Sequence, residues 1–268
     1  QAEEQQASVS SGRLASHSAY FIPMWSVVCR LFPIAQERGI NARVTTDQQP
    51  PRPAQRLRLT FSKGGPARTI SHLDLARALE RSLNRAELPV AYTQGFNRRP
   101  RLSLAAALPL GYTSAAEVAD VWLLEPIAAE VFQERLAARL APGLGLLAVA
   151  EIPLAAPSAQ GQLVAAAYEV AFPFGVDAAT LRAAVTGVLA AESLMRDRRR
   201  AKDTRPQPFD LRPLILAMHL AEDGDGLRLY LELAHTPTAT GRPDDVLAAL
   251  GLDPLDAHVH RVALRFAD

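Results

Sequence analysis

The chain has few of the residues on which many enzyme sites depend. Its 268 residues include one cysteine, Cys29. One cysteine cannot make an internal disulfide, a thiolate zinc site or the cysteine-held cluster of an iron–sulfur enzyme. Low cysteine usage is typical of reducing compartments, so we expect a cytoplasmic protein.

Long apolar runs and nucleotide-binding motifs are also missing. No stretch approaches the roughly 18 apolar residues of a membrane helix, so we expect no membrane partner. There is no GxxxxGK[ST], no GxGxxG and no GxSxG motif. His258 and His260 share one face of a predicted strand, without a clear third metal ligand beside them. We therefore expect no cofactor, no metal and no reaction carried out by this chain itself.

Aromatic residues make up only 6% of the chain, and its net charge is +1. That small charge hides an uneven distribution. Residues 56–101 carry ten Lys/Arg and three acids, which gives +7, whereas residues 102–195 carry three Arg and nine acids, which gives −6. A locally basic region attracts polyanions, so the first of these regions is a candidate nucleic-acid contact.

The order of apolar patterns predicts two similar halves. Residues 1–55 read as an N-terminal extension, largely disordered or linker, that ends in the proline-rich QQPPRPAQ (48–55). Residues 56–152 then predict β-α-β-β-α followed by a last strand, and residues 163–268 repeat this order with one added strand. We predict an α+β protein of two ferredoxin-like, split β-α-β halves with antiparallel sheets, joined by a linker over 153–162.

Within the first half, RLRLTFS (56–62) alternates as a half-buried strand does, and its polar residues Arg56, Arg58 and Thr60 are predicted to face outward. The helix over 69–89 has Ser71 as its predicted N-cap, with Asp74 three residues on. Further strands are predicted over the apolar run 101–110 and, at the end of the chain, over 258–266.

Arginines around this helix predict an RNA-binding surface. Three of them recur at helical spacing and three lie in the following loop, where Gly95 permits a tight turn and Phe96 and Asn97 can touch bases. A second basic stretch, RDRRRAKDTR (196–205), is expected to clamp the RNA. The predicted RNA-binding residues are Arg77, Arg81, Arg85, Gly95, Phe96, Asn97, Arg98, Arg99, Arg101, Arg198, Arg199 and Arg200. The alternative interpretation is a solvated helix face, with Phe96 in the core and the arginines paired to acids.

A second hypothesis is an RNA-processing or RNA-modifying enzyme. His72, Asp74 and Asp210 are its candidate general acids and bases. It requires a pocket that unites His72 with a carboxylate of the second half. Against it, Ser71 and Asp74 suit helix capping, and Asp210 suits a local ion pair with Arg212.

The stretch SHLDLARALERSLNRAELPVAYTQGFNRRPRLSLAAALPLGYTS (71–114) resembles the radical SAM-associated family of uncharacterised bacterial proteins. The resemblance extends over residues 56–266. The matching residues are Ser71, His72, Leu73, Asp74, Gly95, Phe96, Asn97, Pro100, Ser103, Pro109, Gly111 and Ser114. Here Arg98 and Arg99 replace a more usual Pro-His pair.

Members of that family are fused to a radical SAM enzyme or are encoded beside one, often near ribonuclease G and ribosomal-protein genes. The resemblance implies an accessory role in RNA or ribosome-linked modification, with a separately encoded radical SAM enzyme as partner. We therefore expect a non-catalytic RNA-binding accessory protein. The alternatives are the RNA-acting enzyme above and a protein-interaction module without RNA contact.

Overall fold

A computed structural model describes residues 51–198, 205–223 and 226–267. These residues belong to one compact unit. The predicted extension falls almost entirely outside the described residues, and the first strand begins at Gln55, at the end of that segment.

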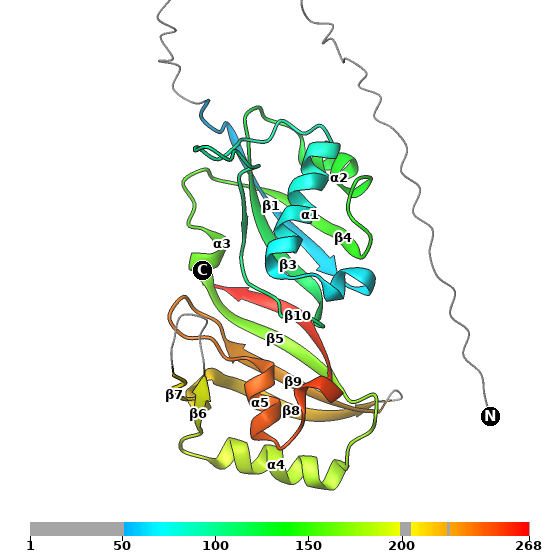
Figure 1. The fold of residues 1–268 in the computed structure, drawn as a ribbon, viewed down its shortest axis with the longest axis vertical. Helices are drawn as coiled ribbons and strands as arrows, with labels where there is room; N and C mark the ends of the chain where they lie inside the picture. The colour runs from blue at the N-terminus through cyan, green and yellow to red at the C-terminus, as the bar shows by residue number, and fades with distance from the viewer. Residues whose placement is uncertain (1–50, 199–204, 224–225, 268) are drawn as a thin grey trace, which may run out of the picture. The chain divides into compact units, whose positions relative to one another are not determined.

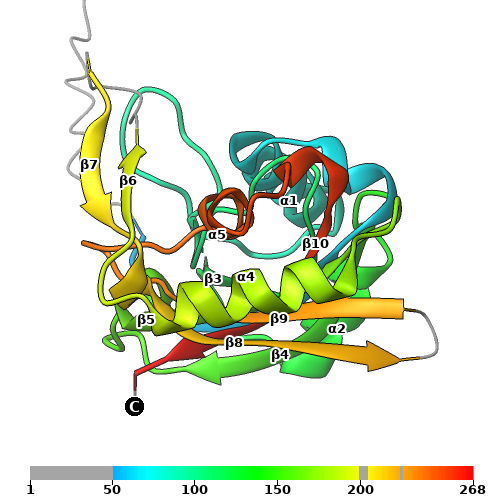
Figure 2. The same cartoon turned by 90° about the horizontal axis from the view of Figure 1, so that it is seen from below.

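The described residues form a mixed α/β structure with a large, mostly antiparallel sheet (Figure 1). Its eight strands are β1 (Gln55–Lys63), β2 (Leu102–Leu104), β3 (Thr113–Leu123), β4 (Leu144–Ile152), β5 (Leu163–Ala171), β8 (Ile215–Asp223), β9 (Gly226–Ala234) and β10 (His258–Phe266). Two short strands, β6 (Met195–Arg198) and β7 (Gln207–Asp210), pair as a separate ribbon that extends away from the main sheet (Figure 2).

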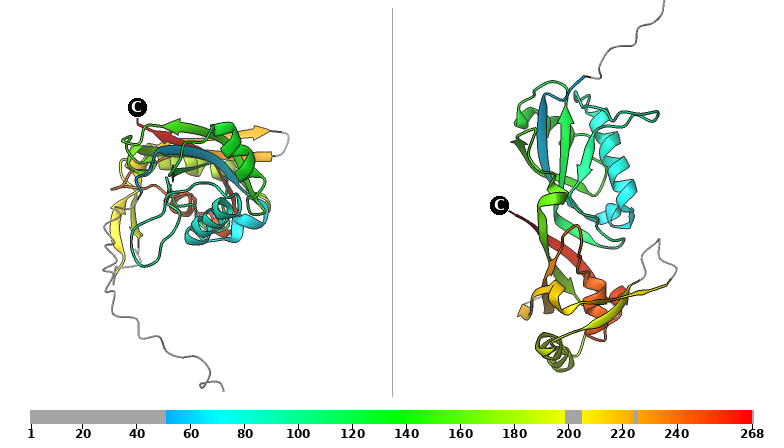
Figure 3. Two further views of the ribbon diagram at one scale, coloured as in Figure 1. Left: turned by 90° about the horizontal axis from the view of Figure 1, so that it is seen from above. Right: turned by 90° about the vertical axis from the view of Figure 1, so that its left-hand side faces the viewer.

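The helices are α1 (His72–Arg85), α2 (Ala129–Ala137), α3 (Ala159–Gln162), α4 (Ala178–Ala190) and α5 (Pro243–Ala249), and three short 3-10 turns are η1 (Gly65–Thr69), η2 (Arg212–Leu214) and η3 (Pro254–Asp256). In Figure 2, α1 and α5 lie on the same side of the sheet. Figure 3 shows the same arrangement from above and from the side, with α1 over the first-half strands.

The strands run in the order β4-β1-β3-β10-β5-β9-β8, and β2 also pairs with β3. β10 and β3 are parallel over two residue pairs, His260 with Thr113 and Arg261 with Ser114, while all other pairs are antiparallel. The expectation of two separate sheets is therefore wrong: the strands of both halves form one. β2 covers only part of the edge of β3, so the remaining edge is open to β10.

Apolar alternation in β1 is confirmed, because Leu57, Leu59 and Phe61 are almost completely buried. They pack beneath α1, whose buried leucines are spaced four residues apart. Each fully buried leucine of this kind contributes about 1.5–3 kcal/mol. The predicted N-cap is also confirmed, since the Ser71 hydroxyl accepts a hydrogen bond from the Asp74 amide at 3.2 Å.

Two predicted elements differ in the structure. The apolar run 101–110 forms a strand only over β2, because Leu108 and the nearby Tyr112 turn into the core of the second half. The segment 153–162, predicted as a linker, contains α3 and packs through the buried Ala159. Both segments therefore join the halves by packing.

Candidate nucleic-acid interface and a buried charged cluster

The loop over residues 92–101 is held at its base and exposed at its tip. Thr93 donates its amide to the Arg99 carbonyl at 2.8 Å, and the Arg99 amide donates to the Thr93 hydroxyl at 3.1 Å. Gly95 has φ +123°, which a residue with a side chain rarely adopts. The tip is therefore a defined turn, and Phe96 on it is fully exposed, with a relative accessibility of 103%. The interpretation that Phe96 lies in the core is wrong.

The start of this loop is tied to the end of α1. The Tyr92 hydroxyl donates to the Asn84 side chain at 2.8 Å. Arg81 lies one helical turn before Asn84, so it lies at the same end of the helix as the loop. Arg81, Arg98 and Arg99 are exposed, and none of them has an ion pair with another described residue.

The other arginines predicted on α1 are engaged. Arg77 pairs with Asp74 at 3.1 Å, and both side chains are half-exposed. Arg85 donates to the Arg139 carbonyl at 2.8 Å, just beyond the end of α2. An exposed ion pair such as Arg77–Asp74 is weak, so Arg77 can still exchange partners.

Arg101 lies on the other face of the sheet. Its guanidinium stacks on the Trp122 ring at 4.5 Å, and Arg56 stacks on the same ring at 4.8 Å. Val121 and Leu123 point into the core under α1, so Trp122 between them points to the opposite face. The six arginines predicted to bind RNA in this half therefore divide between two faces.

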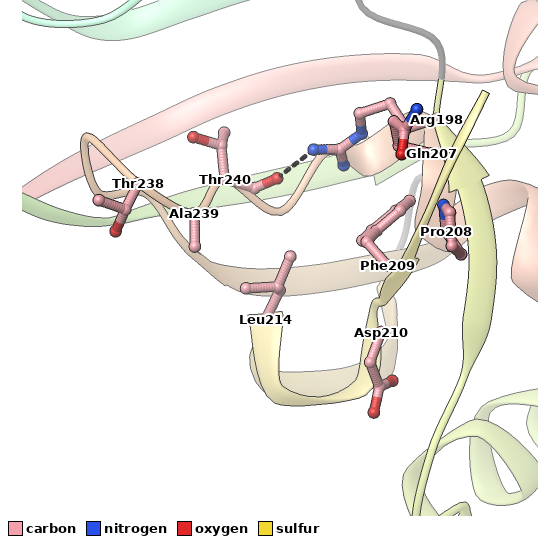
Figure 4. A pocket seen from close by; sticks show the side chains of 9 residues that line it. All are labelled: Arg198, Gln207, Pro208, Phe209, Asp210, Leu214, Thr238, Ala239 and Thr240. Carbon is pink, nitrogen blue, oxygen red and sulfur yellow. Dashed lines mark hydrogen bonds between the residues drawn. The ribbon is translucent and has the colours of Figure 1, made fainter. Parts of the chain in front are cut away.

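Arg198, which was predicted to clamp RNA, is engaged in contacts within the protein. Its guanidinium donates to the Thr240 carbonyl at 2.9 Å (Figure 4) and stacks on Phe209 at 4.2 Å. It also pairs with Asp245. These contacts anchor the β6–β7 ribbon beside a small pocket of about 190 Å³ that Leu214 also lines. Arg199 and Arg200 lie outside the described residues.

The carboxylates proposed as general acids or bases are engaged in local turns. Asp74 accepts from the Ser71 hydroxyl at 2.7 Å, and this hydrogen bond is the main cause of its lowered pKa. Asp210 accepts from the backbone amides of Leu194 and Arg212 at 2.8 and 3.0 Å, which lowers its pKa. The expected Asp210–Arg212 ion pair is wrong, because Arg212 contributes its backbone amide.

The charges that act on His72 belong instead to a buried cluster that the sequence reasoning missed. Arg261 of β10 donates twice to the Glu117 carboxylate of β3, at 2.9 and 2.8 Å, and both side chains are almost completely buried. Lys63, at the end of β1, is 1% exposed. Burial lowers the pKa of His72, and the charges of Arg261 and Lys63 lower it further, whereas Glu117 raises it. The carboxylate in this cluster comes from the first half, not the second.

One sequence signal could have indicated this cluster. Lys63 follows Leu57, Leu59 and Phe61 at the two-residue spacing of one strand face, so its side chain is directed into the core. Glu117 precedes the inward-facing positions of β3 at the same spacing. Charged residues in an inward register indicate a buried polar site.

A second buried pair lies on the opposite face of the sheet. Asp120 is fully buried and accepts from Arg56 at 2.6 Å, from Arg58 at 2.8 Å and from the Ala159 amide at 3.2 Å. Burial alone raises the pKa of Asp120, but the hydrogen bonds from Arg58 and Arg56 outweigh it and lower the pKa. Arg56 and Arg58, predicted to face outward, are therefore structural.

The predicted histidine pair is separate from these clusters. His260 bonds to the Thr113 hydroxyl through Nδ1 at 2.8 Å, at the parallel junction of β10 and β3. Across residues 51–198, 205–223 and 226–267, no three His, Cys, Asp or Glu side chains are grouped so as to hold a metal ion. Within the same ranges, no helix is both long and apolar enough to cross a bilayer.

The chain belongs to the family described as "Uncharacterized protein conserved in bacteria (DUF2344)", whose model matches residues 56–243. A search of the curated proteins finds no match. Among solved structures, one similar chain comes from "Crystal Structure of a Cbf5-Nop10-Gar1 Complex", with a TM-score of 0.42 and 8% identity. That alignment covers 78% of this chain and 48% of the solved chain, so the present chain spans about half of it.

Proposed function

We propose that this protein is a non-catalytic, RNA-binding accessory protein that contacts single-stranded RNA through the 92–101 loop. The observation that carries the proposal is the fully exposed Phe96, held on a defined turn beside the exposed Arg98 and Arg99. Among the described residues, Phe96 is the most exposed large hydrophobic side chain, so its ring is available to a ligand. An unpaired base supplies a flat partner of matching size.

The chemistry of the loop suits both parts of a nucleotide. The ring of Phe96 can stack on a base, which is typically worth about 1–3 kcal/mol. Arg98 and Arg99 can pair with the flanking phosphates and release counterions, so binding becomes salt-dependent. Arg81, at the adjacent end of α1, extends the cationic surface, and Asn97 adds donors and an acceptor for base edges.

The wider role in the proposal depends on the sequence resemblance. As part of it, we infer that the protein works in the cytoplasm with a separately encoded radical SAM enzyme, in RNA or ribosome-linked modification. We also infer that each half is a split β-α-β, ferredoxin-like unit. The supporting observation is the order of the main-sheet strands within each half. In both halves the fourth strand along the chain lies beside the first, the first beside the third, and the third beside the second. These orders are β4-β1-β3-β2 and β10-β5-β9-β8.

The enzyme alternative has less support in the geometry. Asp74 and Asp210 are engaged in separate turns, and the charges that act on His72 belong to the cluster of Lys63, Glu117 and Arg261. The protein-interaction alternative uses the same exposed Phe96, so experiment must separate it from RNA binding.

Fluorescence anisotropy with a labelled single-stranded RNA, repeated over a salt series, tests the proposal. We expect Arg98→Ala/Arg99→Ala to weaken binding and reduce the slope of log K against log salt by roughly 1–2. Phe96→Ala is expected to weaken binding by about tenfold or more at every salt concentration, with an unchanged slope.

The matched control is Arg182→Ala/Arg265→Ala, which removes the same charge from two exposed arginines that pair with Glu222 and Glu232. Equal losses in both double variants would indicate a general charge effect. Wild-type RNA affinity in Phe96→Ala, with loss of radical SAM enzyme binding, would favour the protein-interaction module.

A further inference from the structure

A small pocket lies beside the β6–β7 ribbon in the second half. Its volume is about 190 Å³, and three segments that are separate in sequence line it (Figure 4). They are the ribbon, the 3-10 turn η2 and the loop over residues 238–240. Pro208, Phe209, Leu214 and Ala239 give the pocket mainly apolar walls. Apolar walls with a few polar groups are typical of ligand sites, so the pocket is a candidate for one.

The volume of the pocket limits the size of its ligand. Sites for drug-sized ligands measure about 300–1,000 Å³, whereas an apolar cavity of about 150 Å³ in another protein holds one benzene molecule. A pocket of about 190 Å³ therefore suits one six-membered ring with small substituents. A pyrimidine base has this form, whereas a purine carries a second fused ring.

The ring of Phe209 is held in place from one side. The guanidinium of Arg198 stacks on it at 4.2 Å and is itself anchored by the Thr240 carbonyl at 2.9 Å and by Asp245. Arg198 therefore covers one face of the ring, and partners outside the ribbon fix its position. A flat ring in the pocket can stack against the rest of Phe209, which is how bases of single-stranded nucleic acids bind aromatic side chains.

Polar side chains at the pocket suit the edge of a base. Gln207 supplies an amide that both donates and accepts, and Thr238 and Thr240 supply hydroxyls that can do either. An unpaired pyrimidine presents hydrogen-bond donors and acceptors on its edge, and RNA-binding proteins read a base through such groups. An aliphatic side chain of a protein partner would not use these groups, so they favour a base.

The carboxylates at the pocket are already engaged. Asp245 pairs with Arg198, and Asp210 accepts from two backbone amides, at 2.8 and 3.0 Å. Asp197 is exposed, but it alternates with Arg196 and Arg198 along β6, so it lies on the opposite face of the ribbon. This arrangement leaves little negative charge to repel a phosphate beside the pocket.

Two arginines near the pocket, Arg196 and Arg205, make no ion pair with another described residue. Arg196 lies directly opposite Phe209 in the ribbon, so both side chains are on one face of it. Arg205 is exposed and precedes Gln207 by two residues. The two guanidinium charges therefore complement the phosphates that flank a base in RNA.

The pocket is on the same side of the molecule as the proposed RNA-binding loop. Figures 2 and 3 show the loop over 92–101 and the β6–β7 ribbon projecting to that side. One RNA strand can therefore reach both regions.

We propose that the pocket holds one unpaired pyrimidine base of the same RNA. This inference rests on the proposed function, to which it adds a second contact and a base preference. The base stacks on Phe209, its edge bonds to Gln207 and Thr238, and the flanking phosphates pair with Arg196 and Arg205.

Nuclear magnetic resonance titration of the wild-type protein with uridine tests the pocket directly. The methyl resonances of Leu214 and Ala239 should shift and saturate, because both side chains line the pocket. Adenosine should bind at least about threefold more weakly, since its fused ring exceeds the volume of the pocket. The absence of saturable shifts with uridine overturns the proposal, as does equal or tighter binding of adenosine.

A filled pocket should also weaken the binding of RNA. Ala239→Leu extends a side chain into the pocket from an exposed loop, and it should weaken the binding of oligouridylate, measured by fluorescence anisotropy, by about fivefold or more. The matched control is Ala183→Leu, at an exposed position of α4 outside the pocket, which should leave the affinity unchanged. Wild-type affinity in Ala239→Leu overturns the proposal, as do equal losses of affinity in the two variants.

Three results separate the pocket from the loop. Saturable uridine binding without any binding of RNA supports the pocket as a pyrimidine site and overturns the proposed function. RNA binding that is lost in Phe96→Ala but retained in Ala239→Leu supports the loop and overturns the pocket. Stronger shifts of the same methyl resonances with N-acetylphenylalaninamide than with uridine identify a protein side chain as the ligand, which also overturns the base assignment.

Discussion

Two regions of the molecule use arginine in opposite ways. Around the 92–101 loop, Arg98 and Arg99 are exposed and make no ion pair with a described residue. At the junction of β3 and β10, Arg261 is completely buried and held by the Glu117 carboxylate. One residue type thus supplies a surface available to ligands in the first region and a structural cross-link in the second.

The difference shows that a count of charges is a poor measure of a surface. Residues 56–101 carry +7 in sequence. However, Arg56 and Lys63 are almost fully buried, and Arg58 pairs with the buried Asp120. A polyanion therefore meets a smaller cationic surface than the sequence suggests, concentrated at the loop and the adjacent end of α1.

Removing the carboxylate of the buried pair should have the largest effect on stability. Glu117→Gln leaves Arg261 and Lys63 as buried cations without an anionic partner, and we expect the free energy of unfolding to fall by about 3–5 kcal/mol. Urea unfolding at pH 7 measures the change. The control is Glu222→Gln, which breaks the exposed pair with Arg182 and should cost less than about 1 kcal/mol. Equal losses of unfolding free energy in the two variants would contradict the expected difference between a buried and an exposed ion pair.

A smaller effect is expected from mild acid, through the half-buried histidines. Burial is the main cause that lowers the pKa of His235 to about 4, and it also lowers the pKa of His72. Because the unfolded chain binds these protons near pH 6.5, the histidines contribute stability above that pH. They lose it as pH falls toward about 4. Asp120 and Asp210, with lowered pKa values, contribute to acid unfolding only below about pH 3.8.

Urea unfolding at pH 7 and at pH 4.5 checks this expectation. Between pH 7 and pH 4.5, protonation linked to His235 should lower the free energy of unfolding of the wild type by about 1–2 kcal/mol, allowing for solvent screening. His235→Gln should lose correspondingly less, because its side chain does not titrate. A wild-type stability that stays level between the two pH values would contradict the assigned direction of the shift.

Much of the fold could be predicted from local patterns. The cap at Ser71 and the strand over 258–266 are confirmed because capping chemistry and two-residue alternation are local properties. The junction of β10 with β3 could not be predicted, because no local signal specifies which strand edge pairs with another. The packing of the predicted linker 153–162 could not be predicted for a similar reason. Small and polar residues there pack on a sheet face whose buried Asp120 lies far away in sequence.

The candidate site was predictable only where its residues are exposed. The turn at Gly95 and the arginines beside it follow from composition, and the structure has them on a defined loop. Arg101 was grouped with them because it is adjacent in sequence. However, Arg101 stacks on Trp122 on the opposite face. Lys63 and Glu117 could not be placed in a site from composition, because charged residues face solvent in most strands.

The smallest effect on stability should come from substitutions in the 92–101 loop. This expectation separates the loop most clearly from the buried Arg261–Glu117 pair. Phe96→Ala and Arg98→Ala/Arg99→Ala remove side chains that contact little of the folded protein, so each should change the free energy of unfolding by less than about 0.5 kcal/mol. Urea unfolding measures this in the samples used for RNA binding. A loss above about 1 kcal/mol would mean that the loop supports the fold. Weakened RNA binding would then report damage to the structure rather than lost contacts, because a ligand-binding surface and a structural cross-link differ in whether stability survives their removal.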